Sequence, residues 1–138
     1  MIRKLRLASG LLLFAFVVTH LLNHALGLLS ISAMQAGLTL FTALWRSPPG
    51  TLLLYGALLL HVGLALRALY RHRRLPPPAE AAQLLLGLSI PPLIALHVAG
   101  TRGVSEFFGV QADYPYILTI FFKLAPFNGI LQAVAACV

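Results

Sequence analysis

The chain has 138 residues, of which 59% are hydrophobic and only 9% are charged. A soluble globular domain carries about 25% charged residues, so this composition excludes one and indicates an integral membrane protein. The net charge of +7 does not indicate nucleic-acid binding, because the ten basic residues lie in short clusters beside apolar segments. The single cysteine, Cys137, excludes a disulfide framework and a cysteine-rich metal site.

Three apolar segments are long enough to cross about 30 Å of hydrocarbon as helices. They run from about residue 5 to 29, from 51 to 70 and from 80 to 100. The first is not a signal peptide, because polar residues occupy its second half and it has no A-x-A-like end. The pair Pro91-Pro92 predicts a kink in the third segment.

A different pattern follows the first segment. In residues 31–47 the apolar positions recur every three or four residues, which predicts an amphipathic helix at the membrane surface with Trp45 in the interface. Pro48-Pro49-Gly50 is expected to end this helix.

The last third of the chain is less regular. The sequence predicts a loop region over residues 104–126, with one short apolar piece at 116–122. The final apolar run begins near Phe127 and would measure about 18 Å as a helix, which is too short to cross the hydrocarbon core of a membrane. The expected fold is therefore all-α: a polytopic transmembrane helix bundle in one domain, 1–138, with three full spans, a surface helix and a truncated fourth span.

Four histidines lie inside the predicted spans: His20, His24, His61 and His97. An ionisable side chain in hydrocarbon is costly and is a functional candidate, although a lone histidine often only hydrogen-bonds a neighbouring helix. Counting 1.5 Å per residue puts His20, His24 and His97 in the outer half of the membrane and His61 near the midplane. His72 lies in a basic loop and needs no function.

The chemistry around these histidines favours haem. No carboxylate lies within a span, which argues against a proton-coupled transporter and a hard-cation site. Zinc would need three or four converging histidines, whereas a b-type haem needs one histidine on each face from two helices. We expect His97 and either His20 or His24, with His24 preferred, to ligate an outer haem iron. Arg102 would neutralise a propionate, and His61 would ligate a second haem.

Three stretches of the chain carry distinctive signatures. They are 6–10 together with 19–27, which reads T-H-L-x-N-H-A-x-G, then 43–57, which contains W-R-x-P-P-G-T, and 90–102. These stretches resemble the N-terminal membrane anchor of bacterial class III adenylate/guanylate cyclases. That anchor is itself similar to the cytochrome b subunit of succinate dehydrogenase/fumarate reductase. The resemblance implies a histidine-ligated, di-haem bundle that senses quinone or redox state, a cytoplasmic cyclase domain after the last span, and a homodimer formed through the full-length protein.

We therefore expect a membrane-anchoring, redox-sensing part of a cyclase that has no catalytic residues of its own. One alternative is a cytochrome b-like electron-transfer subunit that passes electrons to quinone. A second is a plain anchor or small transporter without a cofactor. A cyclase domain after Val138 would favour the first interpretation, and absence of haem in the purified protein would favour the last. The expected partners are the lipid bilayer and quinone, without nucleic acid.

The distribution of basic residues predicts the topology. Arginine and lysine gather before the first span and after the second, at Arg3, Lys4, Arg6, Arg71, Arg73 and Arg74. Two spans bring these clusters to one side, which should be the cytoplasmic side of the inner or cell membrane. Reporter fusions at His72 and Gln35 should therefore report cytoplasmic and external positions, respectively. A cytoplasmic reporter at Gln35 would contradict this orientation.

Overall fold

The computed structural model describes residues 1–71 and 77–137, apart from the side chains of Phe121, Gln132 and residues 135–137. Over these ranges the chain is helical and contains no strand, which confirms the expected all-α class. The basic-loop residues His72, Arg73 and Arg74 lie outside the described residues, as does Val138. The chain divides into two compact units, Met1–Arg74 and Leu75–Val138.

Three helical stretches are long and apolar enough to cross a membrane. They are Ile2–Leu28, Pro48–Arg71 and Pro78–Phe108, in agreement with the three predicted spans. Large apolar side chains on them point outward: Leu52 and Leu59, for example, are 76% and 74% exposed. Such a surface is unfavourable in water and suits contact with lipid acyl chains, so the molecule has the character of a membrane protein.

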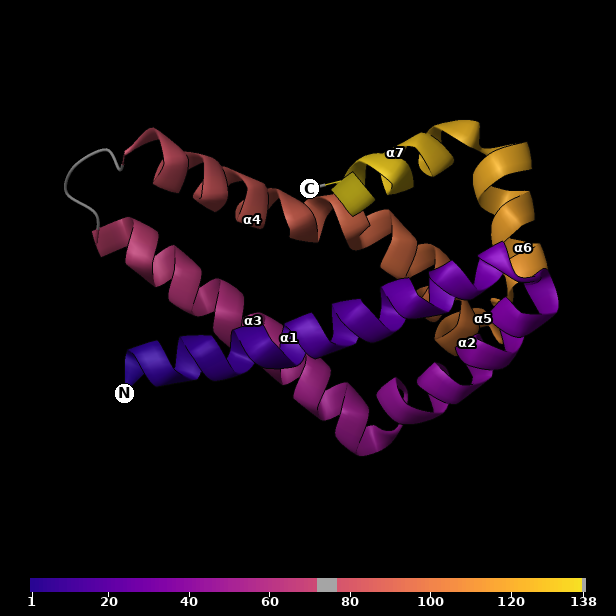
Figure 1. Ribbon diagram of the computed structural model, residues 1–138, viewed down its shortest axis with the longest axis horizontal. Helices are drawn as coiled ribbons and strands as arrows, with labels where there is room; N and C mark the ends of the chain where they lie inside the picture. The colour runs from indigo at the N-terminus through magenta and orange to yellow at the C-terminus, as the bar shows by residue number, and fades with distance from the viewer. Residues whose placement is uncertain (72–76, 138) are drawn as a thin grey trace. The chain divides into compact units, whose positions relative to one another are not determined.

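The first unit contains three helices. Helix α1 covers Ile2–Ala25 and continues into a single 3-10 turn, Leu26–Leu28; α2 covers Ile31–Trp45, and α3 covers Pro48–Arg71. Helix α1 packs against both α2 and α3, and crosses α3 obliquely (Figure 1). The predicted amphipathic helix is therefore present as α2.

Local capping explains the ends of α2 and α3. The Ser30 hydroxyl oxygen accepts a hydrogen bond from the Ala33 N–H at 3.0 Å and so caps α2. Pro48 and Pro49, which we expected only to end the preceding helix, are the first residues of α3. A proline has the right φ for the first turn of a helix and needs no hydrogen-bond acceptor there. The second span thus begins three residues earlier than predicted.

The second unit is built around α4, which covers Pro78–Val98 and runs through Pro91 and Pro92. Helix α7 packs against α4 (Figure 1). The remaining elements are a π-helical turn at Ala99–Gly103, α5 at Val104–Phe108, α6 at Tyr114–Leu118, a π-helical stretch at Thr119–Leu124, and α7 at Pro126–Cys137.

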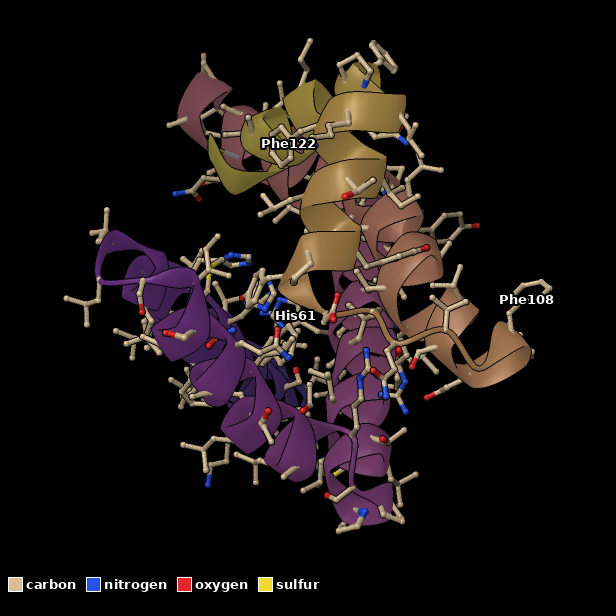
Figure 2. The ribbon with its side chains drawn as sticks, turned by 90° about the vertical axis from the view of Figure 1, so that its right-hand side faces the viewer. His61, Phe108 and Phe122 are labelled. Carbon is tan, nitrogen blue, oxygen red and sulfur yellow. The ribbon has the colours of Figure 1, made fainter. Side chains whose placement is uncertain are left out.

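The prediction of a loop region over residues 104–126 is wrong, because most of this segment is helical. Helix α5 ends at Phe108. It is followed by Gly109, whose φ of 66° is readily available only to glycine. Asp113 then caps α6 by accepting a hydrogen bond from the Tyr116 N–H at 2.9 Å. Pro126 starts α7 rather than breaking a helix. The exposed Phe108 projects from the end of α5 (Figure 2).

The closest approach of α2 to α1 is made at Gly37. This residue faces Asn23, whose side chain is only 2% exposed. A Cβ atom at position 37 would overlap the Asn23 Oδ1 atom and would lie 2.5 Å from a methyl group of Leu26. The two helices can therefore pack in this way only if residue 37 has no side chain.

We predict that Gly37→Ala lowers the free energy of unfolding by about 1–3 kcal/mol, because the added methyl group overpacks the contact. Denaturant unfolding of the detergent-solubilised protein, followed by Trp45 fluorescence, measures the change. Gly56→Ala is the matched control, because a Cβ there meets no atom within 4 Å. It should be neutral or stabilising by up to about 1 kcal/mol, since alanine favours a helix over glycine. Equal effects of the two substitutions would contradict the close approach at Gly37.

Candidate functional site

His61 is held by a serine of the neighbouring helix. It lies on α3 and extends toward α1, where its Nδ1 atom is 3.1 Å from the Ser9 hydroxyl oxygen (Figure 2). Ser9 is 4% exposed, so the contact is shielded from water. Gly10 makes the approach possible, because a Cβ atom there would lie 3.1 Å from His61 Cε1.

The Ser9 hydroxyl lies within hydrogen-bond distance of two groups, the Arg6 carbonyl oxygen and His61 Nδ1, both at 3.1 Å. A hydroxyl has a single hydrogen to donate. When Ser9 donates to the Arg6 carbonyl oxygen, it can only accept from His61, and the neutral imidazole then carries its proton on Nδ1 with a lone pair on Nε2. A histidine that ligates a metal commonly has this arrangement, in which a hydrogen bond at one nitrogen orients the other.

A groove opens beside His61. Its volume is about 490 Å³, and it is lined by Arg3, Arg6, Leu7, Gly10, Leu11 and His61. Five of these six residues come from the first turns of α1. The lining combines two guanidinium groups, an imidazole and leucine side chains, which together suit a flat, largely apolar molecule with acidic substituents. The volume lies within the range of about 300–1,000 Å³ that is usual for ligand sites.

A second cluster lies toward the other end of α1. The Nε2 atoms of His20 and His24 are 3.2 Å apart, and the two rings are nearly perpendicular, with their centroids 4.6 Å apart. Phe16 stacks on His20 with a centroid distance of 5.6 Å and an interplanar angle of 13°. This i, i+4 pair on one face of α1 agrees with the predicted spacing.

Trp45 connects this cluster to α2. Its indole N–H donates to the Thr19 hydroxyl oxygen at 3.0 Å, and its ring packs edge-on against Phe16 at 5.4 Å. Thr19 in turn donates to the carbonyl oxygens of Ala15 and Phe16 at 3.1 and 2.9 Å. Thr19 therefore accepts from α2 while its own hydroxyl hydrogen stays within α1.

The remaining predicted site residues lie in the second unit. His97 is half-buried near the end of α4, and its carbonyl oxygen accepts a hydrogen bond from the Thr101 hydroxyl at 2.7 Å. The Arg102 Nε–H donates to a carboxylate oxygen of Glu106 at 2.6 Å. The sequence predicts a propionate partner in Arg102, whereas in the structure this guanidinium group forms an ion pair within its own segment.

The structure separates the histidines of the first unit into two levels. Ser9, which marks the level of His61, is eleven residues from His20, which corresponds to about 16 Å along α1. His61 therefore cannot share an iron with His20 or His24. Among the residues that the structure describes, no three histidine, cysteine, aspartate or glutamate side chains converge on a metal site.

Two contributors were missed by sequence reasoning. Ser9 orients His61, and its signal was a small polar residue beside Gly10 within an apolar run, which often marks a helix contact. Phe16 orients His20, but a phenylalanine in an apolar helix gives no signal of such a role.

Comparison of the chain with protein-family models, with curated proteins and with solved structures finds no match in any of the three.

Thr19→Val should lower the free energy of unfolding by about 0.5–1.5 kcal/mol, because the isosteric valine leaves the buried indole N–H of Trp45 without its acceptor. The same denaturant titration measures the loss, and the emission of Trp45 should shift. Thr39→Val serves as the control, because the exposed Thr39 hydroxyl donates only to the Gln35 carbonyl oxygen of its own helix. Unchanged stability and emission in Thr19→Val would refute the role of this hydrogen bond.

Proposed function

We propose that this chain is a haem-bearing membrane anchor that senses redox state, with His61 as an axial ligand of a b-type haem. The three long apolar helices support the anchoring role. A bound haem would supply a one-electron redox centre in the membrane. The chain's own residues would bind the ring, orient the ligand and balance the charge of the propionates.

The observation that carries the proposal is the hydrogen bond between Ser9 and His61. It leaves the Nε2 lone pair of His61 available, and a neutral imidazole with an available nitrogen is what an iron ligand requires. When the Ser9 hydroxyl donates to the Arg6 carbonyl oxygen, the His61 proton lies on Nδ1.

The groove beside His61 fits the remainder of the cofactor. Leu7 and Leu11 offer apolar surface to a porphyrin face, and Arg3 and Arg6 provide two cations for two propionates. His20 and His24 would not ligate the same iron, because they lie at another level of α1. The outer haem predicted on His97 and either His20 or His24 remains a prediction, since His97 belongs to the other unit.

The proposal extends to a cyclase through the sequence signatures alone. The T-H-L-x-N-H-A-x-G and W-R-x-P-P-G-T stretches resemble the membrane anchor of class III adenylate/guanylate cyclases. In that context the module would transmit the redox state of the quinone pool to a cytoplasmic catalytic domain in a homodimer. If the chain instead served electron transfer, the same haem would exchange electrons with quinone.

Haem binding tests this function directly. The full chain is purified in detergent, titrated with haemin and followed by optical spectra of its oxidised and reduced forms. His61→Ala should abolish the absorption of one bound haem. His72→Ala, in the basic loop, should leave the haem absorption unchanged. His97→Ala tests the outer haem in the same assay and should remove a separate component. A chain that binds no haem, or an unchanged spectrum in His61→Ala, would overturn the proposal.

The positioning role of Ser9 has its own readout. Ser9→Ala removes the acceptor of the Nδ1 proton, so we expect haem affinity to fall about 10- to 100-fold and the midpoint potential to change. Ser9→Thr retains a hydroxyl and should restore much of both. A wild-type potential in Ser9→Ala would show that this serine only fills space.

A further inference from the structure

The pair His20 and His24 has a geometry that haem ligation does not explain. Two imidazoles on one helix face, with their Nε2 atoms 3.2 Å apart, cannot lie on opposite sides of one porphyrin ring. We propose that they act together as a two-nitrogen chelate for a small divalent transition-metal ion of the zinc class. The proposal is independent of haem at His61, and it is an alternative to the outer-haem role expected of His20 or His24.

The nitrogen–nitrogen distance matches the size of such an ion. Zinc–nitrogen bonds measure about 2.0–2.1 Å, so two nitrogens on a tetrahedral zinc ion lie about 3.3 Å apart. The ring centroids of His20 and His24 are 4.6 Å apart, whereas their Nε2 atoms are 3.2 Å apart. The nitrogen tips are therefore the nearest parts of the two rings, and small rotations of the rings about their side-chain bonds would aim both lone pairs at one ion beside the line that joins them.

The available ligands select the kind of ion. Residues 1–74 contain no aspartate or glutamate, so this unit offers no carboxylate for a hard cation such as Mg²⁺ or Ca²⁺. Imidazole nitrogen is the preferred ligand of zinc and its transition-metal neighbours. Without metal, one Nε2–H points at the other Nε2. The ion would take the place of this shared proton, which moves to Nδ1 of the same ring.

The surroundings hold the pair in place before any ion arrives. Phe16 stacks on His20, and Trp45 packs on Phe16 while donating to Thr19. The two chelating residues are one helical turn apart within α1, so little conformational freedom remains to be lost on binding.

The position of the pair also leaves an entry path and room for further ligands. His24 is exposed and lies one residue before the end of α1, while His20 is half-exposed one turn earlier. Two protein nitrogens leave two positions of a tetrahedral ion for water or for a group from another molecule. Zinc sites that one chain builds alone use three or four protein ligands, so this pair would hold an exchangeable ion whose coordination is completed by water or by a group from another molecule.

The test uses the full chain, purified through an affinity tag that contains no histidine and reconstituted in nanodiscs of zwitterionic lipid. Co²⁺ is the probe, because its visible absorption reports tetrahedral coordination, and Zn²⁺ should displace it. Mg²⁺ should not compete. Cu²⁺ bound at the pair should also quench the fluorescence of Trp45, the only tryptophan of the chain.

Substitutions identify the ligands. His20→Ala and His24→Ala should each weaken Co²⁺ binding by at least about tenfold, the lower limit of what loss of even a supporting group costs a metal site. His72→Ala, which removes a histidine without an assigned role, is the matched control and should bind normally. His24→Ala combined with Ala25→His keeps the histidine count but turns one imidazole off the shared face, so it should behave like His24→Ala.

The outcomes separate this proposal from haem binding. The exposed His24 can be replaced with little risk to folding, and Trp45 emission without metal checks each variant. Normal Co²⁺ affinity in His24→Ala, no Co²⁺ absorption in the unaltered chain, or loss of binding in His72→Ala would each overturn the chelate. If His61→Ala loses haem but still binds Co²⁺, both proposals are supported. If the unaltered chain binds Co²⁺ but no haem, only the proposed function is refuted.

Discussion

Helix α1 is fixed to its neighbours by two polar contacts that lie about 15 Å apart along its axis. At one level Ser9 meets His61 of α3, and at the other Thr19 accepts the indole N–H of Trp45 from α2. In apolar surroundings, association of helices gains little from the hydrophobic effect, so such contacts and close packing carry the specificity. Both candidate sites of the first unit depend on them. The haem proposal needs the orientation of His61, and the chelate needs the Phe16 and Trp45 rings around His20.

Small residues work with these contacts. Gly10 lets His61 approach α1, and Gly37 lets α2 reach Asn23. The glycines at positions 56 and 63 of α3 have no neighbour within 4 Å of a Cβ. The space for a cofactor beside His61 is therefore provided by α1, where the groove also contains Arg3 and Arg6. The first turns of α1 thus combine support for His61, apolar surface and positive charge.

The four histidines of the predicted spans differ in their chemical surroundings. His61 has one nitrogen committed and the other available, which suits a single axial bond. His20 and His24 point their nitrogens at each other, which suits a shared ion. His97 lies just before a π-helical turn, a kind of irregularity that is often found at functional sites. A redox module that combined a haem with an exchangeable metal ion would respond to two independent signals through one helix.

The sequence by itself determined the class of the protein and the positions of its long helices, because charge depletion and apolar length depend on composition and not on tertiary contacts. It also placed four histidines in apolar segments and put His20 and His24 on one face, since helical periodicity is local. It placed the start of the second long helix three residues late, because Pro48 and Pro49, which follow the end of α2 as expected, also fit the first turn of α3. Only the tertiary structure decided that Ser9 supports His61 and that Thr19 serves Trp45. These partners are 52 and 26 residues apart in the chain, and which side chain a helix face meets depends on how the helices cross.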